Sequence, residues 1–90
     1  MRVHELKCWG KYFNELSSGK KKFELRKNDR NFKVGDHLCI QAYDPEKKEY
    51  TGGFLYFIVT YILNIGEFLE GHDDWVVMGI KRLSFSSSED

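Results

Sequence analysis

The 90-residue sequence predicts one α+β domain, mainly β, in the form of a small closed or nearly closed β-barrel. Three observations lead to this fold class. Five segments have the alternation or the short apolar runs of strands, one segment has the spacing of an amphipathic helix, and glycines lie where strands would bend. We therefore expect five to six strands, one helix after the first strand, a domain over residues 1–83 and a flexible C-terminal tail over residues 84–90.

The helix is expected directly after a first strand at residues 2–7. Its apolar stripe, at positions i, i+3, i+4 and i+7, consists of Trp9, Tyr12, Phe13 and Leu16. Gly19 suits the end of the helix, because glycine readily adopts the left-handed backbone found there. The stripe predicts that at least two of Trp9, Tyr12 and Phe13 pack in the core. Trp9, at the end of the stripe, is the best placed of the three to stack on a base.

Four further strands are expected at residues 20–27, 37–43, 54–63 and 75–83, with a short helical turn at residues 65–69. Gly52-Gly53 predicts a bulge or a sharp bend early in the strand that follows the Asp44-Pro45 turn. Residues 54–63 are apolar at most positions, which predicts a strand covered on both faces. The alternative is that this strand binds a protein partner or a second copy of the chain.

Two cysteines, Cys8 and Cys39, are far apart and have no metal-ligand spacing around them. The N-terminus has no long apolar run suited to export, and the longest apolar run is too short to span a bilayer. We therefore expect a cytoplasmic protein that has no membrane association, no metal and no cofactor. A monomer or a weak homodimer is expected.

Charge is distributed unevenly although the net charge is zero. Between residues 19 and 36, seven lysines and arginines outnumber three acids, a net charge of +4, whereas seven acids outnumber two lysines between residues 44 and 74, a net charge of −5. Such asymmetry creates a local positive field, which favours a short anionic ligand over a long phosphate track. The alternative is an ordinary solvated surface loop.

The centre of the basic segment holds a carboxylate that could lie between two cations. Glu24 and Arg26 are two residues apart on a predicted strand, so their side chains leave the same face. Lys21 has the opposite parity and joins them only if the chain bends near Gly19. In that arrangement Glu24 can accept hydrogen bonds from a base, and Arg26 offers a planar donor fork to phosphate or carbonyl oxygen. The alternative is a surface ion pair worth well under about 1 kcal/mol.

The other candidates for ligand contact are Arg30, Asn28, His4, Lys7 and Trp9. Residues 28–31 are rich in turn formers, so Asn28 and Arg30 form either a plain turn or part of the site. His4 could donate or accept a hydrogen bond in a cleft, although a satisfied core histidine is the more common case. Cys8 is expected to be a small buried thiol.

The run Gly19-Lys20-Lys21-Lys22-Phe23-Glu24-Leu25-Arg26 resembles the Gly-x-Lys-x-x-Glu-x-Arg signature of the ASCH family, a branch of the PUA-like barrels. More narrowly, the chain is similar to DUF3850, a subfamily of small bacterial and phage proteins, at residues 4–7, 12–13, 23–30, 34–36, 50–52 and 76–80. The resemblance covers nearly the whole chain. It implies a PUA-like barrel with a cleft beside the helix, lined by Lys21, Glu24 and Arg26, that binds RNA or a nucleotide.

The resemblance also raises catalysis as an alternative. One ASCH branch is an amidohydrolase acting on N4-acetylcytidine, and ribonuclease activity has been proposed for ASCH proteins. If this chain were an enzyme, Lys21 and Glu24 would be its acid–base groups. The amidohydrolase branch has threonine where this chain has Glu24, and this departure puts that activity in doubt. We therefore expect a binding domain without catalytic residues.

Overall fold

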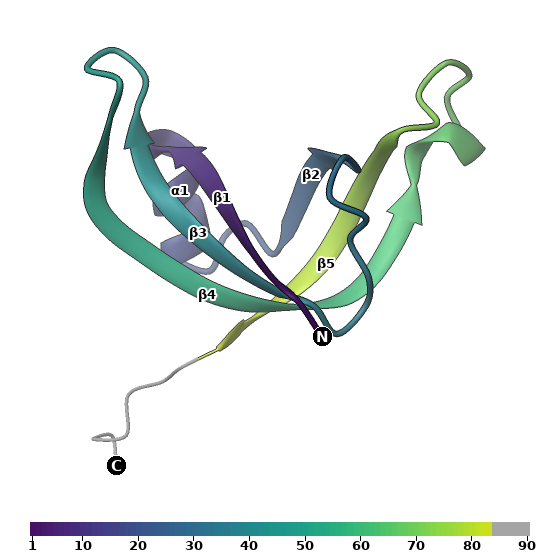
Figure 1. The fold of residues 1–90 in the computed structure, drawn as a ribbon, viewed down its shortest axis with the longest axis horizontal. Coiled ribbons are helices and arrows are strands. Elements are labelled where there is room, and N and C mark those ends of the chain that lie inside the picture. Colours follow the sequence, from purple (N-terminus) through teal and green to yellow (C-terminus); the bar gives the residue numbers. More distant parts are fainter. Residues whose placement is uncertain (84–90) are drawn as a thin grey trace.

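The structure, a computed structural model, describes residues 1–83, so the expected tail at residues 84–90 lies outside the described residues. The elements in chain order are β1 (Val3–Trp9), α1 (Gly10–Ser17), β2 (Phe23–Lys27), β3 (His37–Asp44), β4 (Glu49–Asn64), the 3-10 turn η1 (Ile65–Glu67) and β5 (Trp75–Leu83). All five strands form one sheet in the order β1-β3-β4-β5-β2, curled into a half-barrel (Figure 1). The predicted fold class, with one helix after the first strand, is confirmed.

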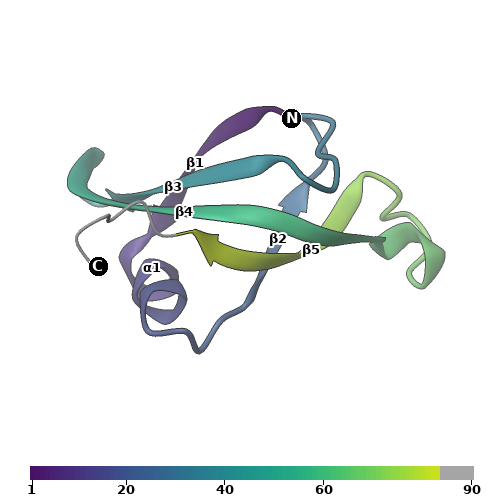
Figure 2. The same ribbon diagram turned by 90° about the horizontal axis from the view of Figure 1, so that it is seen from below.

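The two edge strands of the sheet are neighbours in the sequence. β1 pairs with β3 in parallel, while β2 pairs with β5 antiparallel at the other edge. A parallel pair needs a long crossover connection, and α1, β2 and the following loop supply it. Figure 2 shows β1, β3, β4 and β5 in succession, with β2 passing behind β4 and β5. Within residues 1–83 no backbone hydrogen bond joins β1 to β2, so the half-barrel stays open along this line.

The curl comes from β4, which pairs with β3 through its first part and with β5 through its second. The register with β3 shifts between Gln41 and Tyr43, opposite the Gly52-Gly53 pair, which confirms the predicted bulge. Gly52 has a φ of 100°, which L-residues rarely adopt. At Gly53 a Cβ atom would lie 3.2 Å from the Phe13 ring, so this glycine lets the helix approach the sheet.

The core lies on one face of the curled sheet. Its buried members, with Phe32 from the loop after β2, are Leu6, Cys8, Leu16, Leu38, Ile40, Leu55, Phe57, Val59, Val76, Met78 and Ile80. Phe54 and Tyr61 of β4 are 59% and 62% exposed. The prediction that residues 54–63 are covered on both faces is therefore wrong, because only one face of β4 packs into the core.

The helix α1 contributes less to the core than its apolar spacing indicates. Leu16 is buried and Phe13 packs against the core, but Trp9 and Tyr12 are exposed. The prediction that at least two of the three aromatic residues pack in the core is therefore wrong. Helical spacing identifies residues that share a face, but not what covers that face. Among residues 1–83, no helix has the length and apolar content that a membrane crossing requires.

Candidate functional site

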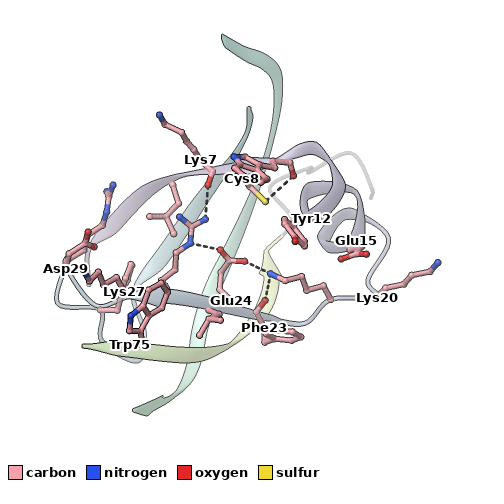
Figure 3. Close-up of a pocket in the computed structure, with 17 residues that line it drawn as sticks. Lys7, Cys8, Tyr12, Glu15, Lys20, Phe23, Glu24, Lys27, Asp29 and Trp75 are labelled. Atoms are coloured by element: carbon pink, nitrogen blue, oxygen red, sulfur yellow. Dashed lines mark hydrogen bonds and ion pairs between the residues drawn. The ribbon is translucent and has the colours of Figure 1, made fainter. Parts of the chain in front are cut away.

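A cavity of about 1050 Å³ lies where the half-barrel is open, between β1, β2 and α1 (Figure 3). Six basic residues line it, namely Lys7, Lys20, Lys21, Arg26, Lys27 and Arg30. Three acids, Glu15, Glu24 and Asp29, also line it, so its wall carries a formal charge of +3. The positive charge predicted between residues 19 and 36 is thus gathered largely around one cavity.

Glu24 lies in the middle of this cavity, and only 3% of it is exposed. Its Oε1 accepts a hydrogen bond of 2.7 Å from Lys21 Nζ, and its Oε2 accepts one of 2.7 Å from Arg26 Nε. Lys21 Nζ also donates to the carbonyl oxygen of Phe23 at 3.0 Å. A carboxylate so deeply buried needs such partners, since an unpaired buried charge is costly. The structure brings together the three charged groups that the sequence singled out.

Lys21 reaches Glu24 because the chain bends between α1 and β2. Gly19 has a φ of 83°, and the backbone N–H of Lys21 donates to the carbonyl oxygen of Glu15 at 3.0 Å. The strand then begins only at Phe23, so strand parity does not apply to Lys21. The geometric condition derived from the sequence, a bend near Gly19, is met.

Arg26 connects the two edge strands. Its Nε bonds Glu24, while its Nη2 donates to the carbonyl oxygen of Lys7 in β1 at 2.8 Å. The planar guanidinium fixes both directions at once, which a lysine could not do. Lys7 takes part through this backbone oxygen. Its ammonium lies 4.4 Å from the centre of the Tyr43 ring and points away from Glu24 (Figure 3).

Most of the chain matches a known protein family. The profile of the family described as "Domain of unknown function (DUF3850)" matches residues 3–80. The chain belongs to the DUF3850 family. The matched range includes every residue that lines the cavity, so the cavity belongs to the DUF3850 domain itself.

One relative is the "Uncharacterized 12.9 kDa protein in GpA 3'region" of Escherichia phage P2, which is 32% identical over 71 residues. These residues make up 79% of this chain but only 63% of that protein, so the chain spans less than two thirds of its relative. The DUF3850 fold is similar to the crystal structure of the hypothetical protein PH0355, with a TM-score of 0.61 and 19% identity over 92% of this chain and 100% of that one. This likeness shows a shared fold.

His4 and Asn28, both candidates from the sequence, do not line the cavity of this DUF3850 domain. His4 is buried, with its Nε2 2.8 Å from Oδ2 of Asp36 and its ring edge-on to Phe32. The Asn28 side chain accepts a hydrogen bond of 2.9 Å from the backbone N–H of Phe32. Both side chains therefore stabilise the loop after β2. Trp9 and Arg30, by contrast, line the cavity.

Asp36 is a second buried carboxylate, to which the sequence assigned no role. Its Oδ1 accepts from the backbone N–H of Arg2 at 3.1 Å, and its Oδ2 accepts from that of Lys33 at 3.1 Å as well as contacting His4. Burial alone would raise the pKa of Asp36. The hydrogen bonds from His4, Arg2 and Lys33 outweigh burial, and the pKa is lowered.

Cys8 lies in the cavity wall as a buried thiol, as expected. Burial raises its pKa, and the negative charge of Glu24 raises it further, against smaller opposing effects of Lys21 and Arg26. The thiolate, which is the reactive form, is therefore disfavoured.

Sequence reasoning missed several residues of the cavity. Tyr12 was assigned to the core, and Trp75 and Lys27, which are partners in the β2–β5 register, received no role. Trp9 and Trp75 are the two tryptophans of the chain, and both line the cavity. The available signal for Trp75 was its position at the start of a strand, directly after three polar residues.

Proposed function

We propose that this DUF3850 domain is an ASCH-type, PUA-like barrel that binds RNA or a nucleotide in the cavity between β1 and β2. The observation that carries the proposal is the buried Glu24 carboxylate, held between Lys21 and Arg26 inside a positively charged cavity. Each carboxylate oxygen has a further lone pair that can accept a hydrogen bond from a base. The fixed position of the carboxylate would make this contact selective.

The aromatic residues of the cavity support a nucleic-acid ligand. Trp9, Tyr12 and Phe23 are 57%, 43% and 47% exposed, and all three line the cavity. Stacking of a base on such a ring contributes about 1–3 kcal/mol. Arg30 and Lys20 also line the cavity and can pair with phosphate oxygens. Rings for bases and cations for phosphates are thus combined in one cavity.

The contacts of Lys21 and Glu24 favour binding over catalysis. Both oxygens of Glu24 accept hydrogen bonds from cations, and Lys21 donates to Glu24 and to a backbone carbonyl. An acid–base pair must exchange a proton with its substrate, which here would require breaking these contacts. Hydrolysis of a modified nucleoside or of RNA remains the alternative, and product formation from N4-acetylcytidine or labelled RNA would favour it.

The test is a tryptophan-fluorescence titration with short single-stranded RNA at several salt concentrations. We expect quenching, with an affinity that falls with salt. Arg30→Ala should weaken binding several-fold and reduce the slope of log affinity against log salt by about 0.7, as expected for one lost phosphate contact on a single strand. Lys21→Ala should also weaken binding.

Lys47→Ala is the matched control, because Lys47 is an exposed lysine in the β3–β4 turn, outside the cavity. Circular dichroism should show that all variants remain folded. If Arg30→Ala and Lys21→Ala bound RNA with the same affinity and salt slope as Lys47→Ala, the proposed site would be wrong. If the unmodified chain bound neither RNA nor nucleotides, the proposed function would be wrong.

A further inference from the structure

The cavity has two ends, with Glu24 between them. Figure 3 shows Tyr12, Glu15 and Lys20 on the side of α1, and Lys27, Asp29 and Trp75 on the opposite side. Trp9 belongs to the first group, because it directly precedes α1. We call these groups the α1 end and the β5 end, since Trp75 begins β5.

Each end combines an aromatic surface with cations. At the α1 end Trp9 and Tyr12 line the cavity together with Lys20, and Lys21 Nζ lies 5.0 Å from the centre of the Phe23 ring. At the β5 end Trp75 lies opposite Lys27 in the β2–β5 register, and Arg30 lines the same wall. A ring and a neighbouring cation are the two elements that one nucleotide needs, for its base and its phosphate. The cavity therefore contains this combination twice.

Three hydrogen bonds in a row run through the cavity between the two ends (Figure 3). They join Lys21 to Glu24, Glu24 to Arg26, and Arg26 to the carbonyl oxygen of Lys7. Phe23 lies on the α1 side of the cavity and Lys27 on the opposite side (Figure 3). As the first and last residues of β2 they are four residues apart, which is ~13 Å at about 3.3 Å per residue. One base cannot contact the rings at both ends across this distance. The volume of about 1050 Å³ is at the upper limit of the range of about 300–1,000 Å³ that is usual for one small-molecule ligand, so it has room for a dinucleotide.

We infer that the cavity holds two consecutive nucleotides of a single RNA strand, one base at each end, with the linking phosphodiester beside Arg26. This inference rests on the proposed function and narrows its ligand to a dinucleotide unit. The bases must be unpaired, since stacking on Trp9 and on Trp75 requires that each base leave a duplex. Glu24, between the two ends, is placed to contact either base.

The two tryptophans allow each end to be observed separately. Trp75→Phe leaves Trp9 as the reporter of the α1 end, and Trp9→Phe leaves Trp75 as the reporter of the β5 end. Both variants would be titrated with the monophosphates AMP, CMP, GMP and UMP and with the dinucleotides pApA, pCpC, pGpG and pUpU. We expect at least one dinucleotide to quench both reporters over the same concentration range and to bind about tenfold or more tightly than its monophosphate.

Trp75→Ala should lower the affinity for that dinucleotide to the level of its monophosphate. Phe54→Ala, which changes an exposed aromatic residue outside the cavity, should leave both affinities unchanged. The inference is overturned if mononucleotides bind as tightly as dinucleotides, or if a saturating dinucleotide quenches one tryptophan alone; binding itself would then still support the proposed function. If neither mononucleotides nor dinucleotides bind, the inference is overturned; if short single-stranded RNA does not bind either, the proposed function is overturned as well.

Discussion

The guanidinium of Arg26 donates a 2.8 Å hydrogen bond to the carbonyl oxygen of Lys7, and so links β2 to β1 across the open line of the half-barrel. A closed barrel would have a ladder of backbone hydrogen bonds in this position. Here a side chain and its partner Glu24 take the place of that ladder. The cavity lies between the two edge strands, and the Arg26 side chain bridges them.

Glu24 and Arg26 should be energetically coupled. Arg26→Gln leaves Glu24 with one cation and frees the Lys7 carbonyl, so we expect the free energy of unfolding to fall by about 1–3 kcal/mol. Glu24→Gln should lower the free energy of unfolding by a similar amount, because it leaves two cations without their carboxylate. Urea denaturation of both single variants and of the double variant measures the effect.

The double variant, with Glu24→Gln and Arg26→Gln together, completes a double-mutant cycle. Because each single substitution already breaks the shared contact, the double variant should be less destabilised than the sum of the two single variants. Strict additivity would show that the 2.7 Å contact between Arg26 and Glu24 contributes nothing to stability.

The reactivity of Cys8 should report the charge of Glu24. Since the Glu24 carboxylate helps to raise the pKa of Cys8, Glu24→Gln should lower that pKa and speed alkylation by iodoacetamide a few-fold at a fixed pH. The experiment uses a Cys39→Ala background, so that Cys8 is the one thiol observed. The midpoint of the pH–rate profile should move to lower pH.

Glu15→Gln serves as the control for this experiment, because Glu15 lines the same cavity and is not among the groups that shift the pKa of Cys8. A faster rate with an unchanged midpoint would point to local opening of the cavity, contrary to the electrostatic explanation.

Asp36 should make stability sensitive to acid. Its pKa is lowered in the folded chain, so its contribution is complete above the ordinary aspartate value of 3.8 and is lost as the pH falls below that value towards the folded-state pKa. Asp36→Asn should lower the free energy of unfolding by about 1–3 kcal/mol at pH 7. The amide has one acceptor oxygen in place of two, so it cannot accept all three hydrogen bonds. The variant should also lose less stability than the unmodified chain on acidification.

Urea denaturation at a series of pH values measures both effects. Glu49→Gln, at an exposed position of β4, is the control and should follow the unmodified chain. Parallel pH profiles for Asp36→Asn and the unmodified chain would show that the Asp36 hydrogen bonds do not lower its pKa.

Leu16 should be the main anchor of α1. It is the buried residue of this helix, at 2% exposure, so Leu16→Ala should reduce the free energy of unfolding by about 2–5 kcal/mol. Lys11→Ala, on the exposed side of α1, should change it by less than about 0.5 kcal/mol. Thermal denaturation compares the two variants. Equal melting temperatures would mean that α1 is held by contacts other than Leu16.

The local features of the fold follow from local patterns in the sequence. The last strand is found at Trp75–Leu83, the range predicted, and the bulge is found at Gly52-Gly53. These features depend on the alternation of apolar and polar residues and on the positions of glycines. Both patterns extend over only a few neighbouring residues. The error at Trp9 and Tyr12 has a different origin, because the sheet ends beside α1 and a cavity takes the place of further core. Periodicity carries no information on that arrangement.

The candidate site was predictable to the same extent. The shared face of Glu24 and Arg26 follows from strand parity, and the role of Lys21 followed once a bend at Gly19 was required. The contact from Arg26 to Lys7 depends on the curl of the whole sheet, and the position of Trp75 depends on the β2–β5 pairing. Neither relationship can be predicted from the residues next to it in the sequence.

The pairing of β2 with β5 also determines when the cavity can form. Lys27 pairs with Trp75, 48 residues later, and Phe23 pairs with Gly79, 56 residues later. Contacts so distant in sequence close late in folding, after the entropy of long loops has been lost. A chain still lacking β5 would have nowhere to anchor β2, so Arg26 could not reach the carbonyl oxygen of Lys7. The cavity therefore takes shape only once β5 has paired with β2.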